Sequence, residues 1–152
     1  MKISEVAIEE LIPHQEPMIL LDQAIATSDD SVTCQLTITE ANPFYQPEGV
    51  PNWIGIEFMA QAIAVYRGWQ LYQQRQTPQL GFLLGSRKYT AHCEYFLPGQ
   101  VLHISASLIY LEETLGSFDC NIHTEDGQLL ATGRINTFMP EKSKIEEYLS
   151  GK

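Results

Sequence analysis

Glu57 stands in a stretch, 52–66, whose other residues are almost all apolar. Apolar residues on every side predict a buried helix there, and a lone buried carboxylate is costly unless it is paired or hydrogen-bonded. Gln61 follows one helical turn after Glu57, on the same edge of one apolar stripe. A carboxylate beside an amide could act as a general acid or base on a substrate that enters an apolar site. The alternative is that Glu57 occupies the first helical turn, where the helix dipole favours an acid, and reaches solvent.

His14 is the second residue that could transfer a proton. It lies between Pro13 and Pro17, in a loop that leads into the apolar run 18–21, and prolines can hold such a loop and its imidazole in one orientation. The alternation of apolar and polar residues places the other histidines on polar strand faces; these are His92, His103 and His123. His14 is therefore the candidate base, with a structural histidine bonded to a backbone carbonyl as the alternative.

Length, apolar runs and cysteines limit the class of protein. A chain of 152 residues is expected to form a single domain, 1–152, with a proper core. No apolar run approaches the roughly 18 residues of a membrane span, and no signal peptide is evident, so a soluble cytoplasmic protein is expected. Cys34, Cys93 and Cys120 are far apart in strand-like runs, which predicts reduced core thiols and neither disulfides nor a metal site.

The net charge of −10 argues against a nucleic acid partner, because binding to phosphates depends on Lys and Arg. Residues 1–66 hold ten acids and one base, whereas residues 67–88, here named the basic segment, hold four bases and no acid. The four cations are Arg67, Arg75, Arg87 and Lys88. They either solvate an exposed helix end and a neighbouring loop, or form a docking site for an anionic partner.

The hydrophobic pattern predicts one long helix and about six antiparallel strands. The helix begins after Asn52, its expected N-cap, and ends before Thr77 and Pro78. A helical turn or two is expected within 5–11, and a short helix or a frayed tail at the C-terminus. Strands are predicted over 18–26, 31–39, 81–96, 101–110, 117–123 and 129–138. These elements favour an α+β fold in which a curled antiparallel sheet wraps around one long central helix.

Five segments, in this order, resemble the hotdog-fold 3-hydroxyacyl-ACP dehydratases of type II fatty-acid synthesis. They are Leu11-Ile-Pro-His-Gln-Glu-Pro-Met-Ile-Leu-Leu-Asp22, Asn42-Pro-Phe-Tyr-Gln46, Gly55-Ile-Glu-Phe-Met-Ala-Gln61, Leu97-Pro-Gly99 and Asp126-Gly-Gln-Leu-Leu-Ala-Thr-Gly133. The resemblance implies a hotdog fold, two protomers that join their sheets, and acyl tunnels along the dimer interface. It also implies dehydration of a 3-hydroxyacyl thioester on acyl carrier protein to the trans-2-enoyl product, with no metal or organic cofactor.

One feature of this family is absent from the sequence. The family's usual catalytic histidine stands in a Gly-His-Phe-Pro segment before the helix, whereas 45–52 is shorter here and contains no histidine. His14 matches a histidine that the family carries near its N-terminus. The short loop resembles that of a branch of dehydratase-like proteins from aryl polyene clusters.

The resemblance implies a role for each candidate residue. Glu57 would protonate the departing 3-hydroxyl, Gln61 would orient Glu57 or a water, and His14 would remove the C2 proton if the dimer brings it within reach. The expected substrate-binding residues at the helix start are Trp53, Ile54, Gly55 and Phe58. Backbone N–H groups of the first three would polarise the thioester carbonyl, because such groups lack intrahelical partners.

Two other functions remain open on the sequence. A hotdog thioesterase would use Glu57 to activate water for hydrolysis of an acyl-CoA or acyl-ACP, and a non-catalytic acyl-binding subunit would pair with an active homologue. Acyl carrier protein is the expected partner, and the basic segment is expected to dock it through Arg87 and Lys88. A homodimer, or a heterodimer with a related hotdog protein, is expected because a single curled sheet leaves an edge strand unpaired.

Overall fold

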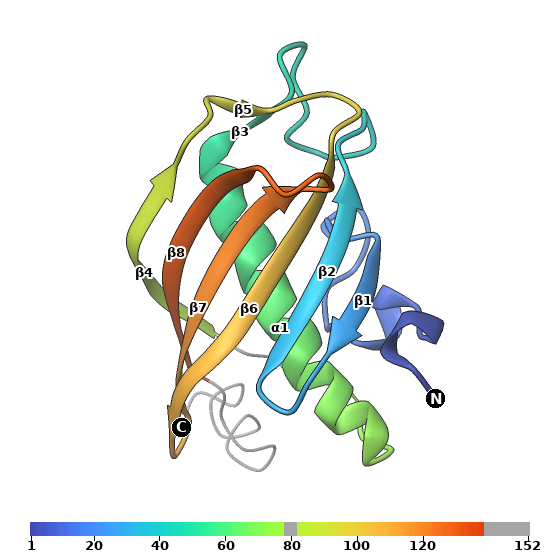
Figure 1. Ribbon diagram of the computed structural model, residues 1–152. Helices are drawn as coiled ribbons and strands as arrows, with labels where there is room; N and C mark the ends of the chain where they lie inside the picture. The colour runs from blue at the N-terminus through green and yellow to red at the C-terminus, as the bar shows by residue number, and fades with distance from the viewer. Residues whose placement is uncertain (78–81, 139–152) are drawn as a thin grey trace, which may run out of the picture.

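A long helix packed along one face of an antiparallel sheet organises the protein. The computed structural model describes residues 1–77 and 82–138. Its helix, α1 (Gly55–Gln73), crosses the concave side of the sheet (Figure 1). The prediction of a curled antiparallel sheet wrapped around one central helix is confirmed, and the sheet is open rather than closed into a barrel.

Six strands form the main sheet in the order β1-β2-β6-β7-β8-β4, and all neighbours are antiparallel. Their bounds are β1 (Gln23–Thr27), β2 (Ser31–Thr37), β4 (Phe82–Ala91), β6 (Val101–Glu112), β7 (Leu115–Thr124) and β8 (Leu129–Phe138). Two short strands, β3 (Val50–Pro51) and β5 (Tyr95–Phe96), pair separately. At one edge of the sheet β4 pairs only with β8 among the described strands (Figure 1).

Strand alternation separates an apolar core from a polar outer face. In β2 the side chains of Val32, Cys34 and Leu36 are buried, and the residues between them are partly exposed. The first half of β6 and the second half of β7 alternate in the same way, so one face of the sheet packs on α1 and the other carries polar side chains. This alternation is why period-two patterns in the sequence located these strands correctly.

The N-terminal residues pack directly on α1. Two short 3-10 helices occur here: η2 (Ile8–Glu10) forms within the predicted range 5–11, and η1 (Ile3–Glu5) begins before it. Immediately after η2, the carbonyl oxygen of Leu11 lies so close to Gly68 of α1 that a Cβ at Gly68 would overlap it. Glycine within a helix lowers its stability by about 1 kcal/mol relative to alanine. At this position it allows the backbone of Leu11 to contact the helix directly. Residues 11–20 are named the N-terminal strap below.

Several predicted elements differ in detail from those observed. The strand predicted over 18–26 begins only at Gln23, because the backbone of Leu20 bonds a helix side chain instead of a neighbouring strand. The strand predicted over 81–96 divides into β4 and β5, which belong to different sheets. Its first residue, Gly81, and the predicted C-terminal helix or tail lie outside the described residues.

The helix start also differs from the prediction. The Asn52 side chain does not cap the helix; its Nδ2 donates to the carbonyl of Cys93 at 2.8 Å. A 3-10 turn, η3 (Asn52–Ile54), leads into α1 instead. Within the described ranges, no helix is both long and apolar enough to cross a membrane.

Candidate active site

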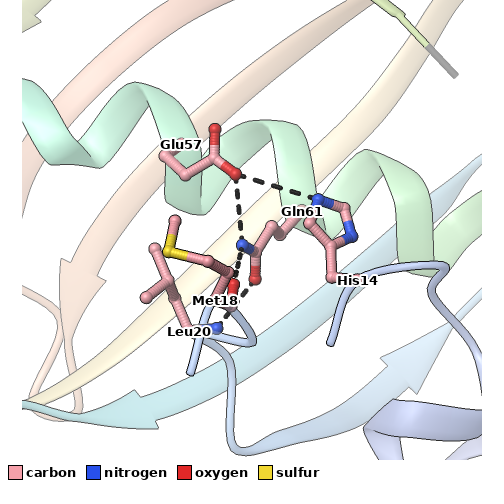
Figure 2. A network of polar contacts seen from close by, with 5 residues as sticks. All are labelled: His14, Met18, Leu20, Glu57 and Gln61. Atoms are coloured by element: carbon pink, nitrogen blue, oxygen red, sulfur yellow. Dashed lines mark hydrogen bonds and ion pairs between the residues drawn. The ribbon is translucent and has the colours of Figure 1, made fainter. Parts of the chain in front are cut away.

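Gln61 is a fully buried side chain that ties α1 to the N-terminal strap. Its Oε1 accepts the backbone N–H of Leu20 at 2.9 Å, and its Nε2 donates to the carbonyl of Met18 at 2.7 Å (Figure 2). These backbone partners fix which end of the amide is the donor. The second hydrogen on Nε2 is donated to Glu57 Oε1 at 3.1 Å. Gln61 therefore orients the carboxylate, in agreement with the spacing of one helical turn.

Glu57 is only partly buried, with 36% of its side chain exposed. The carboxylate is therefore not isolated in an apolar core, because it has both solvent contact and an amide donor. One oxygen, Oε1, is held by Gln61, and Oε2 has no hydrogen bond within residues 1–77 and 82–138. That arrangement leaves one carboxyl oxygen available to a bound substrate.

The strap brings His14 to Glu57 within the same protomer. His14 Nε2 lies 3.9 Å from Glu57 Oε1 (Figure 2), which is too long for a hydrogen bond but close enough for transfer through a small intervening group. The side chain of His14 is 31% exposed. Its other ring nitrogen, Nδ1, is buried and has no partner within the described part of the chain. The structural alternative, a histidine held by a backbone carbonyl, is therefore not what these residues form.

Two attachments of the strap account for this proximity. Upstream of His14, Leu11 rests on Gly68; downstream, Met18 and Leu20 are bonded by Gln61. The residues between these points must cross the helix surface, and the imidazole is carried with them. A hollow of about 620 Å³ opens beside the imidazole. Its lining residues are Glu9, Ile12, Pro13, His14, Gln15, Glu16 and Ile19.

Two predicted substrate-binding residues at the helix start need correction. The N–H of Gly55 is already donated to the carbonyl of Asn52 within the 3-10 turn, so it is not a free donor for a thioester. Phe58 is fully buried, and its ring packs 5.5 Å from that of Phe96 between centroids, so it is a core residue of the protomer.

The other two substrate-binding residues at the helix start remain predictions. Trp53 is 63% exposed, four residues before Glu57 and hence on the same side of the helix. Ile54 is partly buried against the core. An exposed tryptophan one turn from a carboxylate is suited to cover an apolar acyl chain.

Of the remaining histidines, His103 and His123 lie on a polar strand face, as predicted, whereas His92 lies just past the end of β4 and not on a strand. His92 is exposed, while His103 and His123 face each other across β6 and β7 with ring centroids 5.6 Å apart. Burial, followed by the neighbouring His103, lowers the pKa of His123. Gln35 forms a hydrogen bond with a ring nitrogen of His103. Asn121 forms one with a ring nitrogen of His123. None of these rings contacts the Glu57 site.

Two of the three cysteines are core residues with free thiols, as predicted. Cys34 and Cys120 are buried free thiols, and Cys93 is partly buried. Burial raises the pKa of both Cys34 and Cys120 to about 12, so these thiols are protonated and unreactive. No group of three or more His, Cys, Asp or Glu side chains able to hold a metal occurs in the part of the chain that the structure describes.

Sequence reasoning missed how the strap and the helix start are held in place. The available signal was a pair of glycines, Gly55 and Gly68, in an otherwise favourable helical sequence. Glycine is unfavourable inside a helix, so each indicates a close approach. The structure shows Leu11 at Gly68 and the hydroxyl of Tyr89 at Gly55.

Comparisons with known proteins show which family the chain resembles over its length. The family model described as ApeP-like, ApeP dehydratase, matches residues 6–150. The solved dehydratase heterocomplex ApeI:P from Xenorhabdus doucetiae is similar, with a TM-score of 0.85 and 36% identity, over 95% of this chain and 97% of that chain. The 3-hydroxyacyl-[acyl-carrier-protein] dehydratase FabZ of Streptococcus gordonii is 26% identical over 134 residues, covering 85% of this chain and 92% of the relative.

A more distant likeness concerns the fold alone. A hypothetical thioesterase protein of Streptococcus pneumoniae TIGR4, solved with coenzyme A, has a TM-score of 0.61 and 13% identity, over 78% of this chain and 84% of that chain. It shows that the hotdog architecture is shared across reaction classes. The family match, in contrast, spans nearly the whole chain, and the protein therefore belongs to the ApeP-like dehydratase family.

Proposed function

We propose that the protein dehydrates a 3-hydroxyacyl thioester carried by acyl carrier protein, giving the trans-2-enoyl product in fatty-acid or polyene-type lipid synthesis. The observation that carries this proposal is the placement of His14 Nε2 opposite Glu57 Oε1 at 3.9 Å. Elimination of water removes a proton at C2 and a hydroxyl at the adjacent C3, so the base and the acid must be neighbours. We place the reaction in the cytoplasm, as the resemblance to type II fatty-acid synthesis implies.

The proposed reaction assigns one proton transfer to each residue. Neutral His14 accepts the C2 proton on Nε2, and the carboxyl of Glu57 donates its proton to the C3 hydroxyl, which leaves as water. The thioester carbonyl bears negative charge as the C2–H bond breaks, and donors near Trp53 and Ile54 would stabilise that charge. After the product leaves, the imidazolium returns its proton to the facing carboxylate. Protons therefore balance without exchange with solvent.

An end-point assay on the purified protein tests this function against its alternatives. Incubation with a 3-hydroxyacyl-ACP is expected to give the trans-2-enoyl-ACP, detected by mass and by ultraviolet absorbance, with no release of free thiol. Release of thiol without enoyl product would show a thioesterase. Binding with neither product would show a non-catalytic acyl-binding subunit. Repeating the assay with a co-purified hotdog homologue distinguishes a subunit that needs its partner from one that is inactive.

We further propose that a second hotdog subunit, either another copy or a related chain, covers the Glu57 site. On α1 a partly exposed stripe contains Ile56, Ala60 and Ala64, and the exposed Trp53 of η3 precedes it. Small and apolar residues at one-turn spacing suit close packing against another protein surface. The solved relative is a heterocomplex by its title. A partner placed there would exclude water from the carboxylate.

The first prediction is that the protein is at least a dimer. The edge of β4, which pairs with no second strand among the described residues, and the partly exposed helix stripe together favour pairing with another chain. Multi-angle light scattering at micromolar concentration is expected to give a mass of at least twice that of one 17.2 kDa chain. A mass near 17.2 kDa for the isolated protein, unchanged when a related hotdog protein is added, would contradict the prediction.

Charge placement supports carrier-protein docking at the basic segment. Arg87 and Lys88 are exposed on β4, and neither forms an ion pair within the described ranges. They immediately precede Tyr89, whose hydroxyl bonds Asn52 at the start of α1, so the strand that carries the two cations also contacts the start of α1. A chain of net charge −10 repels an acidic carrier protein unless a local cationic surface attracts it.

The second prediction is that the double variant R87E/K88E has a higher KM for acyl-ACP, by about tenfold at low salt, because two attractive contacts become repulsive. Turnover of the same acyl group on pantetheine is expected to stay nearly unchanged. Stopped assays on both substrates across a salt series measure this. If the variant R67E/R75E raised KM instead, Arg67 and Arg75 would form the contact with the carrier protein. If R87E/K88E lost turnover equally on both substrates, Arg87 and Lys88 would support the fold and not the docking.

A further inference from the structure

Tyr89 is a partly buried polar side chain that the proposed reaction does not use. Its hydroxyl donates to the carbonyl oxygen of Asn52 at 2.6 Å, at the first residue of η3. Burial raises the pKa of Tyr89 to about 12. The phenol therefore keeps its proton at neutral pH and remains a hydrogen-bond donor to the helix start.

A β-bulge in β4 turns Tyr89 toward the helix. Between Arg87 and Thr90, β4 uses one residue more than its partner β8, and Lys88 takes the left-handed backbone conformation with φ of 57°. In an unbroken strand, Tyr89 would share the outer face with Arg87, because side chains alternate. Bulges redirect a side chain in this way, and here the redirected side chain is the phenol.

Two glycines make room for the phenol. A Cβ at Gly55 would overlap the hydroxyl oxygen of Tyr89, and one at Gly133 would lie 3.2 Å from Cδ1 of its ring. The helix start and strand β8 thus each have a glycine where they contact Tyr89. Such a fit indicates that the position of the phenol is defined by contact on two sides.

The residue to which Tyr89 bonds is itself held at several points. The Asn52 carbonyl also accepts the N–H of Gly55. The backbone N–H of Asn52 donates to the carbonyl of Glu94 at 3.0 Å. Its side chain donates to Cys93 at 2.8 Å. The first turn of α1 is therefore attached to the β4–β5 region, whereas the strap that carries His14 is attached further along the helix.

We propose that Tyr89 is a positioning residue for the dehydration, which holds the first turn of α1 so that Glu57 keeps its distance from His14. This inference rests on the proposed function. Glu57 follows Gly55 by two residues, so rotation or translation of that turn moves the carboxylate. His14 does not move with it, because Leu11 and Gln61 fix the strap to later turns. Misplacement by 1 Å can cost about 100-fold in rate.

The closing experiment compares Y89F with Y66F. Tyr66 lies on α1 and also donates its hydroxyl to a backbone carbonyl, that of Asp29, at 2.8 Å; Y66F therefore removes an equivalent bond away from the first turn. Y89F is expected to lower kcat by about tenfold with KM changed less than about twofold. Y66F is expected to keep kcat near that of the parent protein. Circular dichroism confirms that both variants are folded.

A second pair of variants tests the contact itself. G55A places a methyl group on the Tyr89 hydroxyl and is expected to lower both the melting temperature and kcat. In the Y89F background the hydroxyl is gone, so G55A is expected to cost less there, a coupling that only contacting residues show. Thermal unfolding of the parent, both single variants and the double variant gives this coupling without any substrate.

The outcomes separate the inference from the function on which it rests. If Y89F keeps full kcat, or loses no more than Y66F, the positioning role is overturned while the proposed function stands. If G55A lowers the melting temperature equally in the parent and in the Y89F background, the contact between Gly55 and Tyr89 is overturned. If the parent protein turns over no 3-hydroxyacyl thioester, alone or with a hotdog partner, the proposed function fails and the role of Tyr89 in it fails too, while the unfolding data still report the contact.

Discussion

Replacing Glu57 with glutamine is expected to lower turnover of a 3-hydroxyacyl thioester by about 100-fold or more, the range typical of acid/base groups. Glutamine keeps the shape of the side chain and can still accept the Gln61 amide, but it cannot donate a carboxyl proton. The loss is expected in kcat rather than KM, because the interaction is made in the transition state. Steady-state assays of E57Q with 3-hydroxyacyl-ACP measure it.

The control for E57Q is E125Q, which makes the same chemical change at an exposed turn residue. E125Q is expected to behave like the parent protein. Thermal unfolding of E57Q is expected to stay within a few degrees of the parent, since Glu57 is partly exposed and its hydrogen bond with Gln61 can be replaced. Full turnover by a folded E57Q protein would remove Glu57 from the reaction.

The second large effect is expected for H14A, with a loss of about 100-fold in turnover because the C2 proton loses its base. His14 makes no hydrogen bond among the described residues, and its closest charged partner lies 3.9 Å away. Removing the imidazole therefore breaks no bond that the fold depends on. H92A, H103A and H123A are the matched controls, and each is expected to retain most of the activity.

The double variant E57Q/H14A sharpens this test. Residues that act as one unit are not additive, so the double variant is expected to be about as slow as the slower single variant. If H14A retains the full rate, the base is a water or another side chain, and a thioesterase or an inactive subunit gains support. If losses in the double variant simply multiply, the two residues act in separate steps rather than as a pair.

The helix and most of the strands could be predicted because burial imposes a period on the sequence. Stretch 52–66 is apolar all round because α1 packs on the sheet and on the strap, and Ser31–Thr37 alternates because one face of β2 is solvated. The first strand was misplaced because the apolar run before Gln23 is stabilised by a side chain on α1. The local sequence does not distinguish a segment bonded by a helix side chain from a segment paired with another strand.

The site was predictable only where its residues are close in sequence. Glu57 and Gln61 stand one turn apart, so their contact follows from helix geometry. The meeting of His14 with Glu57 depends on the Gln61 bonds to Met18 and Leu20, which join residues 43 and 41 positions apart. Periodicity does not encode such distances. The proline-flanked loop favoured His14 as a candidate but did not show that the same protomer supplies its partner.

Gly68 has a consequence for sorting the relatives of this protein. It stands eleven positions after Glu57, carries no functional group, and lies far from any bond that breaks. Any larger residue there would lift Leu11 away from α1 and with it the histidine three positions further on. A sequence survey that looks only for a histidine in the loop immediately before the helix would discard chains of this kind, because 45–52 contains none. Searching instead for a proline-flanked histidine, Glu57 with Gln61, and a glycine at the position of Gly68 would retain them.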